Sequence, residues 1–202
     1  MGILSYHYMK LHVIVTAFNR PTDLKRLIFD FILQTNKEWG IRIIHDGEPP
    51  VGIVSFIYSL KDKRISFSNT ASVNGFWGHP NRRLLLEQTK GAPDDYVLIT
   101  NDDNQYVKSF WEIMRRQCKP DTGMIFCNTI HNYFDYEILN TEIKVGHIDM
   151  GSFIVRLDVA QKVGFNHTAE VADGFYAEEC AAECKSRKLK IVPVKKALFI
   201  HN

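Results

Sequence analysis

The sequence lacks an apolar run long enough to span a membrane, and its N-terminus lacks the charged segment and apolar core of a secretion signal. Position six holds Tyr6, where a myristoylation signal requires Ser or Thr. Cysteine is scarce, and no CxxC pair or metal-type spacing occurs among Cys118, Cys127, Cys180 and Cys184. We therefore predict a soluble, cytoplasmic protein whose thiols are reduced and mostly buried.

The chain also lacks a surplus of charge of either sign. Its 25 Lys and Arg residues against 23 Asp and Glu leave a net charge of +2, which excludes the global basic field of a nucleic-acid-binding protein. The local basic runs at residues 185–190 and 195–196 are typical of solvated helix ends. With 202 residues, the chain suffices for one sizeable core and is short for two. We predict a single domain spanning residues 1–202.

Buried strands and amphipathic helices alternate in the first half of the chain. Continuous apolar runs predict strands covered on both faces at residues 11–18, 41–47 and 97–100. Apolar residues at helical spacing predict helices over about 23–34, with Thr22 as N-cap, and over 81–89. The order strand, helix, strand predicts a βαβ unit and an α/β fold with a parallel sheet.

The remaining segments are less regular. Residues 52–67 indicate one or two short strands, and residues 74–80 a loop. Further helices are predicted at about 107–116, 157–162 and 173–187. Strands are predicted at 124–128, 152–155 and 189–200, with an antiparallel excursion over 130–137 and 142–145. We interpret residues 1–104 as a nucleotide-type half and residues 105–202 as a second, more irregular half.

The stretch YVLITNDDNQY ends an apolar run in a cluster of acids and amides, Asn101, Asp102, Asp103 and Asn104. In open α/β sheets, ligands bind beyond the carboxyl ends of the strands. Carboxylate and amide oxygens at that end suit a hard divalent cation such as Mg²⁺ or Mn²⁺. From these residues alone a plain turn is the alternative, because Asp and Asn favour turns.

Three motifs in order, VIVTAFNRP, HDG and NDDN, resemble the nucleotide-sugar glycosyltransferases of the GT-A fold, particularly the family-2-like group. The resemblance covers residues 11–201, nearly the whole chain. It implies a Rossmann-like, three-layer α/β/α fold with a mixed, mostly parallel central sheet. It also implies a hexosyltransferase-type enzyme that moves a sugar from a nucleoside-diphosphate sugar, with UDP favoured, to a hydroxyl of a glycan or glycoprotein acceptor.

The resemblance assigns the donor-binding residues. The uracil and ribose would be cradled at the end of the first strand by Thr16, Ala17 and Phe18, with Arg20 beside them. Asp46 matches the acid that contacts the base, although His45 stands where the family usually has a second acid. Arg82 or Arg83 matches a basic helix start near the diphosphate, for which a guanidinium offers two parallel donors.

The resemblance also gives the polar stretch after the third strand a role in binding a metal. In the family this strand ends in Asp-x-Asp, whose acids hold a metal that bridges the two phosphates. Asp103 matches the acid that ligates the metal directly, while Asn101 and Asp102 join the donor-binding set. Mn²⁺ or Mg²⁺ would neutralise the leaving diphosphate. His201 is a candidate further ligand.

Two later segments would supply the acceptor chemistry. HIDMGSF resembles the segment that lines the sugar and acceptor pocket, where Asp149 would bind hydroxyls and Gly151 would let the backbone approach the ligand. ADGFYAEECAAE resembles the region that carries the base of inverting enzymes, which Asp173 matches, with Glu178 as the alternative base. A helix cap is the other role open to Asp173.

Two other functions stay open. Asn101 and Ala172 both replace acids of the family pattern, which favours a binding module of the same fold that holds a nucleotide sugar or glycan without turnover. A sugar nucleotidyltransferase shares the layered fold, but TAFNRP lacks the glycines of its phosphate loop. The sequence stops at a strand end, which favours an excised catalytic domain or a compact enzyme such as a virus-encoded one.

Overall fold

Nine strands form one mixed sheet within residues 9–202, the part of the chain that this computed structural model describes. Residues 1–8, on which the predictions about a secretion signal and about Tyr6 fall, lie outside this range. The strands are β1 (Leu11–Ala17), β2 (Trp39–His45), β3 (Ile65–Asn69), β4 (Tyr96–Asn101), β5 (Gln105–Tyr106), β6 (Thr122–His131), β7 (Glu137–Leu139), β8 (Phe153–Arg156) and β9 (Lys190–His201).

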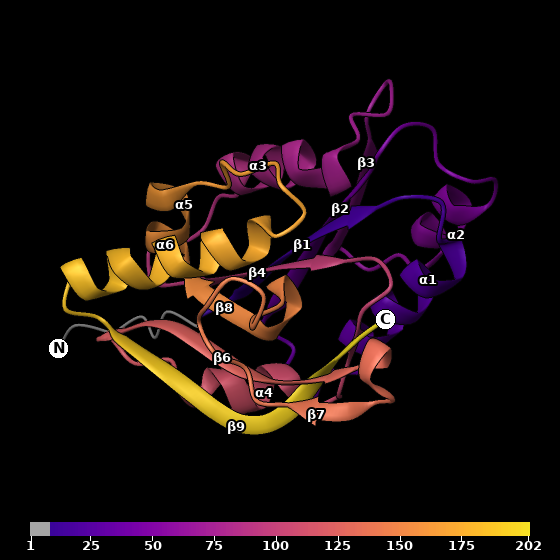
Figure 1. The fold of residues 1–202 in the computed structure, drawn as a ribbon. Helices are drawn as coiled ribbons and strands as arrows, with labels where there is room; N and C mark the ends of the chain where they lie inside the picture. Colours follow the sequence, from indigo (N-terminus) through magenta and orange to yellow (C-terminus); the bar gives the residue numbers. More distant parts are fainter. Residues whose placement is uncertain (1–8) are drawn as a thin grey trace, which may run out of the picture.

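The strand order is β3-β2-β1-β4-β8-β6-β9-β5, with β7 beside β6 (Figure 1). The strands β3, β2, β1 and β4 run parallel, and so do β6 and β9. The short strand β8 runs antiparallel to both of its neighbours, β4 and β6. The prediction of a mixed, mostly parallel sheet is therefore confirmed, and the carboxyl ends of β1, β2 and β4 meet at one edge.

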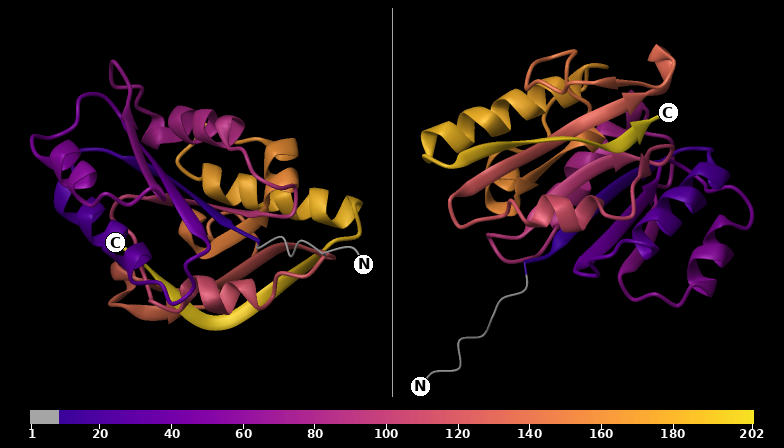
Figure 2. Two further views of the ribbon diagram at one scale, coloured as in Figure 1. Left: turned by 180° about the vertical axis from the view of Figure 1, so that it is seen from behind. Right: turned by 90° about the horizontal axis from the view of Figure 1, so that it is seen from below.

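Helices cover both faces of the sheet (Figures 1 and 2). One face packs under α1 (Pro21–Ile32), α2 (Ile53–Ser59) and α4 (Phe110–Arg115), and the other under α3 (His79–Gln88), α5 (Leu157–Val163) and α6 (Ala172–Ser186). Strand β1 shows why, because Val13 and Val15 join the first core cluster while Ile14 between them joins the second. The three-layer α/β/α prediction is confirmed.

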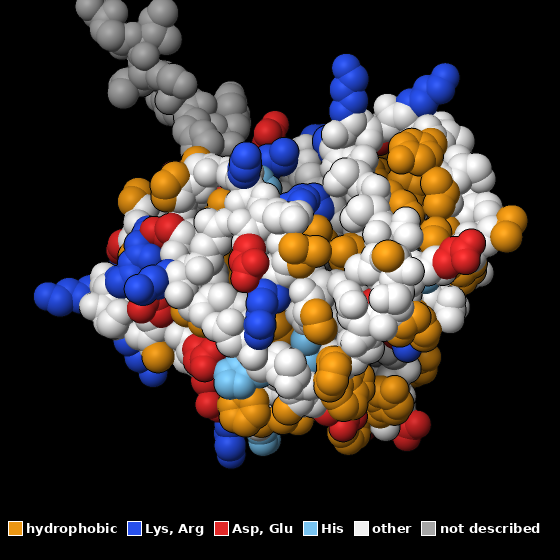
Figure 3. All heavy atoms as spheres, turned by 90° about the horizontal axis from the view of Figure 1, so that it is seen from above, with side chains coloured by type: hydrophobic (Ala, Val, Ile, Leu, Met, Phe, Trp, Pro, Cys, Tyr) orange, Lys and Arg blue, Asp and Glu red, His pale blue; other side chains and the backbone are white. Residues whose placement is uncertain are grey.

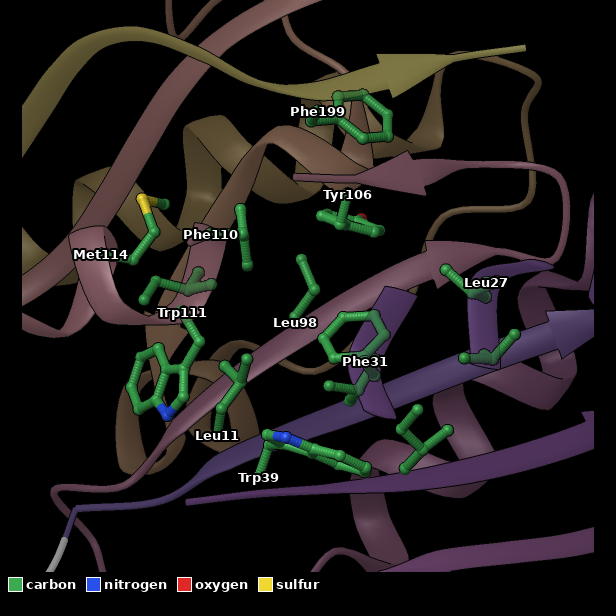
Figure 4. Packing of buried hydrophobic residues seen from close by; sticks show 14 of the residues in the cluster. Leu11, Leu27, Phe31, Trp39, Leu98, Tyr106, Phe110, Trp111, Met114 and Phe199 are labelled. Atoms are coloured by element: carbon green, nitrogen blue, oxygen red, sulfur yellow. The ribbon is translucent and has the colours of Figure 1, made fainter. Parts of the chain in front are cut away.

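The first core cluster holds large aromatic side chains among its more numerous aliphatic ones (Figure 4). The ring of Phe31 lies 6.0 Å from that of Trp39 and 5.2 Å from that of Tyr106, so α1, β2 and β5 share one packed centre. The four cysteines are free and buried, as predicted for structural thiols. A close-packed core of this kind holds the strand ends in fixed relative positions.

Several local predictions were wrong. Residues 52–67 form α2 and then β3, because Ile53 and Ile57 are buried at helical spacing although their residue types favour strands. Thr22 does not cap α1; the helix begins at Pro21, whose fixed φ suits the first helical position. Residues 142–145 form no strand, since the antiparallel excursion ends with β7.

The surface carries both signs of charge. On the face shown in Figure 3, Lys and Arg side chains are interspersed with Asp and Glu side chains, in keeping with the small net charge. In the range 9–202, no helix is both long and apolar enough to cross a membrane.

Candidate functional site

The sheet brings the sequence motifs together at the carboxyl ends of β1, β2 and β4. Thr16 pairs with Asn101 on β4, and Ala17 pairs with His45 on β2. A cavity of about 510 Å³ opens beyond these ends. Except for Arg83, all the residues predicted to bind the nucleotide line it: Thr16, Ala17, Phe18, Arg20, Asp46, Arg82, Asn101 and Asp102.

Backbone contacts fix the turn that follows β1. The N–H of Phe18 donates to Oδ2 of Asp102 at 2.9 Å, and the N–H of Asn19 donates to Nε2 of His45 at 3.2 Å. Nδ1 of His45 lies 3.0 Å from the carbonyl oxygen of Gly47, so Nδ1 carries the ring proton and Nε2 accepts. His45, which replaces an acid of the family pattern, thus holds the turn through both of its ring nitrogens.

Asp46 organises the loop on the other side of the cavity. Its Oδ1 accepts from the backbone N–H of Asn74 at 2.9 Å and from Nδ2 of Asn81 at 3.0 Å. Its Oδ2 accepts from the N–H of Gly75 at 3.0 Å. Burial alone would raise the pKa of Asp46, but these hydrogen bonds outweigh it and lower the pKa. Asp46 is therefore ionised and keeps an acceptor position on Oδ2.

Asp102 and Asp103 form an acidic pair at the end of β4. Burial raises the pKa of Asp102 to about 7, and the neighbouring Asp103 adds to the rise. Burial also raises the pKa of Asp103, against the opposing charge of Arg20, whose guanidinium contacts its Oδ2. Oδ1 of Asp103 is buried and has no hydrogen-bond partner among the described residues. The raised pKa values of Asp102 and Asp103 mean that burial disfavours the two negative charges more than their surroundings stabilise them.

This pair fits a divalent cation in its donor chemistry. Within residues 9–202, no group of three or more His, Cys, Asp and Glu side chains is placed to hold a metal ion by itself. The unpartnered oxygen of Asp103 next to a second carboxylate is nevertheless a hard-oxygen position that a cation would compensate. Phosphate oxygens of a bound donor would have to complete its coordination.

The two arginines of α3 point to different places. Arg82 is 3% exposed and lines the cavity, where its guanidinium contacts the Asn101 side-chain oxygen. Its Nε is buried without a hydrogen-bond partner among the described residues, which leaves one donor for an anionic ligand. Arg83 instead donates to the backbone oxygens of Phe165 and Asn166, at 2.8 and 2.9 Å. Arg83 holds a loop and does not reach the cavity.

A second cavity, of about 440 Å³, lies under β6, β9 and the start of α6. Three of the predicted residues line it, namely Asp149, Asp173 and His201. Nδ1 of His201 lies 2.6 Å from Nε2 of His131, and Nε2 of His201 lies 3.5 Å from Oδ2 of Asp149. The backbone N–H of Tyr133 donates to Nδ1 of His131, so the proton shared between His131 and His201 lies on the other nitrogen of His131, Nε2.

The two candidate bases are separated. Asp173 is mostly buried, and burial together with the charge of Asp149 raises its pKa to about 6. Glu178 does not line the second cavity, because its Oε1 accepts the backbone N–H of Val145 at 2.9 Å on the outer side of α6. The side chain of Asp173 does not cap α6. Its Oδ1 accepts the backbone N–H of the next residue, Gly174, at 2.8 Å.

Arg82 joins the two cavities electrostatically. Burial lowers the pKa of its guanidinium to about 10, while four carboxylates oppose that fall: Asp173, Asp149, Asp102 and Asp103. Two of these belong to the strand end at the first cavity and two line the second. Arg82, which lines the first cavity, is therefore within electrostatic reach of the acids that line the second.

Gly151 was expected to let the backbone approach a ligand, but it is packed against core side chains instead. A Cβ there would lie 2.5 Å from Cε2 of Phe199 and 2.7 Å from the hydroxyl of Tyr106, so the core and not a ligand approaches it. We expect Gly151→Ala to lower the free energy of unfolding by about 1–3 kcal/mol through overpacking. Denaturant unfolding checks this, with Gly52→Ala as a comparison in which nothing lies within 4 Å and only the strain of a positive φ acts. An unchanged midpoint for Gly151→Ala would contradict the packing argument.

Sequence reasoning missed the residues that arrive on loops or from distant strands. Val73, Gly75, Trp77 and Gly78 line the first cavity, and Phe134, His131 and Glu170 line the second. The one signal in the sequence was the segment NGFWG, in which two glycines bracket two aromatic residues. His131 gave no signal, because β6 and β9 come together from opposite ends of the second half.

No family model matches the chain. A cholesterol galactosyltransferase from Borreliella burgdorferi is 28% identical over 131 residues, which is 63% of this chain and 34% of the relative. The chain thus spans about a third of the length of that curated relative.

Solved structures are similar over nearly the whole chain. Staphylococcus aureus TarS 1–349 superposes with a TM-score of 0.76 at 13% identity, over 96% of this chain and 60% of TarS. The same protein in complex with UDP-GlcNAc gives 0.76 at 14% identity, over 96% and 58%. Mannosyltransferase PcManGT from Pyrobaculum calidifontis, in complex with GDP-Man and Mn²⁺, gives 0.71 at 11% identity, over 96% and 57%. The resemblance drawn from the motifs is confirmed: this chain has the GT-A fold of nucleotide-sugar glycosyltransferases.

Proposed function

We propose that this protein is a glycosyltransferase that moves a hexosyl group from a nucleoside-diphosphate sugar, with UDP favoured, to an acceptor hydroxyl. The observation that carries the proposal is the position of Arg82, which lines the first cavity and whose positive charge is stabilised by carboxylates at both cavities. The curated relative is a galactosyltransferase, and the structural neighbours bind UDP, UDP-GlcNAc or GDP-Man. These names support a nucleotide-sugar donor in the first cavity.

The donor would lie along the edge of the sheet. The base and ribose would occupy the part of the cavity between Phe18 and Asp46, where the carboxylate keeps an acceptor position for a ring N–H. The diphosphate would reach Arg82, whose buried Nε has no other partner in the described chain. The sugar would then project towards Asp149 in the second cavity.

Asp173 would act as the base of an inverting displacement. The acceptor oxygen attacks the anomeric carbon and forms the new C–O bond, while the bond from that carbon to the phosphate oxygen breaks and its electron pair leaves with the nucleoside diphosphate. The acceptor proton passes to Asp173, whose pKa of about 6 suits a base that works near neutral pH. The charge of Arg82 stabilises the leaving diphosphate.

A divalent cation, Mn²⁺ or Mg²⁺, would be held by Asp103, with Asp102 beside it. When bound, it would neutralise charge on the two phosphates of the leaving group. Arg20 now contacts Asp103, so its side chain must give way when a cation binds. Arg20 is half exposed, which leaves it room to turn towards the phosphates. The role of His201 as a further ligand stays a prediction, since its two ring nitrogens face His131 and Asp149.

The acceptor would be a neutral, hydroxyl-bearing molecule such as a glycan. The second cavity is lined by the acids Asp149, Glu170 and Asp173, and no Lys or Arg of the described range lines it. An anionic acceptor would meet like charge there, whereas carboxylates bind sugar hydroxyls well. Phe134 adds an exposed aromatic wall.

Calorimetric titration with UDP and with GDP, each with and without Mn²⁺, tests the donor site. We expect Mn²⁺ to tighten binding of one nucleotide, and Asp103→Ala to remove about tenfold or more of that affinity, because it deletes a charged ligand of the cation. Asp121→Ala is the matched control, since Asp121 pairs with Lys190 far from the cavities. If neither UDP nor GDP binds, with or without Mn²⁺, the proposal is wrong.

A non-catalytic binding module of the same fold is the second candidate. The observation that favours it is the contact between Arg20 and Asp103, which gives the carboxylate expected to hold the cation a positively charged partner from the chain itself. Such a module would bind the nucleotide equally with and without Mn²⁺ and release no UDP from UDP-sugars. Release of UDP by the protein, lost in Asp173→Asn, would exclude it.

A further inference from the structure

Trp77 stands apart from the other two tryptophans of the chain. Trp39 and Trp111 are 1% and 0% exposed in the core, whereas Trp77 is 60% exposed and lines the first cavity. Because this exposed indole lines a cavity, it offers a ligand there a large apolar face and an N–H donor. Trp77 belongs to none of the motifs on which the proposed function rests.

The backbone around Trp77 is held in an unusual conformation. Gly75, Phe76, Trp77 and Gly78 have φ values of 67°, 50°, 53° and 80°. Glycine adopts this left-handed region freely, but Phe and Trp rarely do. Strained residues of this kind persist only where the surrounding structure fixes them, and they cluster at ligand clamps.

Both ends of this segment are fixed to the strand ends that build the cavity. On one side, Asp46 accepts the backbone N–H groups of Asn74 and Gly75 at 2.9 and 3.0 Å. On the other side, Gly78 packs so closely on Thr16 that an added Cβ would lie 3.1 Å from its side chain. The segment therefore cannot relax by moving away, and the indole of Trp77 is presented to the cavity.

We propose that Trp77 is a stacking platform for the nucleobase of the donor. The inference rests on the proposed function and adds a residue that sets base binding. An uncharged indole has no affinity for a diphosphate, which falls to Arg82, but its face matches the face of a base. Phe18, also half exposed, lines the same cavity, and the free acceptor position of Asp46 would bind a ring N–H of the base edge.

Tryptophan fluorescence reports on this site with little background. Because the other two indoles are buried, acrylamide quenches the emission of Trp77 selectively in the free protein. We expect saturating UDP with Mg²⁺ to change the emission and to protect it from acrylamide. Inorganic pyrophosphate with Mg²⁺, which lacks a base, should bind without protecting it.

Two variants separate stacking from structure. Trp77→Phe keeps an aromatic face and should bind UDP within about threefold of the parent chain, whereas Trp77→Ala should bind about tenfold or more weakly. Neither substitution should alter pyrophosphate affinity, measured by calorimetry, and thermal unfolding reports whether both variants fold.

The outcomes distinguish this inference from the proposed function. If UDP binds by calorimetry but leaves Trp77 emission and its quenching unchanged, or if Trp77→Ala binds UDP as the parent chain does, the stacking role is overturned and the donor site stands. If neither UDP nor GDP binds the parent chain, the donor site itself is lost, and this inference with it.

Discussion

Asp173→Asn is expected to lower the rate of sugar transfer to water from UDP-sugars by about 10²–10⁴-fold, the usual contribution of a general base. The substitution keeps the shape of the side chain and the acceptor oxygen for the Gly174 N–H, but removes the site that takes the proton. UDP affinity should stay within about threefold, because Asp173 does not line the donor cavity. Release of UDP from a panel of UDP-galactose, UDP-glucose and UDP-GlcNAc measures the effect.

Glu178→Gln discriminates between the two carboxylates proposed as base. Glu178 accepts a backbone N–H outside the acceptor cavity, so its substitution should leave the rate nearly unchanged. A large loss in Glu178→Gln with little loss in Asp173→Asn would reverse the assignment. The pattern is decisive because both substitutions remove one carboxylate from the same helix.

The pH profile follows from the raised pKa of Asp173. Its base form dominates only above about pH 6, so the rate for the parent chain should rise as pH increases through that value and then level off. The residual rate of Asp173→Asn should not show this rise with pH.

The folding stability of the parent chain should fall with rising pH, whereas the rate of sugar transfer rises. The folded chain retains the Asp173 proton between its unfolded pKa, near 3.8, and about 6, where the unfolded chain has lost it. The unfolded chain therefore binds fewer protons in this window, and stability falls as pH rises through it. Asp173→Asn removes this penalty, so the variant should have the higher Tm above about pH 6. Equal Tm values at every pH would show that Asp173 is not buried as a charge.

The donor half of the site was predictable because it depends on strand ends. The runs that became β1, β2 and β4 are mainly apolar, and this composition marks them as buried parallel strands. Parallel neighbours place their carboxyl ends together, and this brought Thr16, Asp46 and Asn101 to one cavity without knowledge of any contact.

The sequence could not choose between neighbours on a helix. Arg82 and Arg83 are adjacent in α3 and differ by about 100° around its axis, so only one can face the cavity. That choice depends on the loop at Phe165, to which Arg83 donates. The strand prediction for the residues of α2 was wrong for a related reason. Tertiary packing of Ile53 and Ile57 overrides the strand preference of their residue types.

The acceptor half was less predictable because it is assembled over long separations in the chain. His131 and His201 are register partners on the parallel strands β6 and β9, and nothing near either residue in the sequence indicates this pairing. The conformation of Trp77 likewise depends on hydrogen bonds from its loop to Asp46, which is distant in sequence. Local patterns carry no information on such contacts.

Arg82→Met should impair both binding and folding. Without the guanidinium the diphosphate loses a charge-assisted partner, and UDP affinity should fall about 10–100-fold. The four carboxylates that Arg82 faces would lose their shared cation, and an uncompensated buried charge typically costs about 3–5 kcal/mol of stability. Calorimetry and thermal unfolding measure the two effects.

Arg82→Lys and a change of pH separate the causes. Lysine keeps the charge without the planar fork, so stability should largely return while UDP affinity stays reduced. In Arg82→Met the pKa of Asp173 should rise further, because the charge of Arg82 lowers it in the parent chain. Protonation of the carboxylates at about pH 5 would then shrink the loss of stability relative to about pH 8. A loss that is equal at both pH values, with UDP affinity unchanged, would mean that Arg82 only fills space in the core.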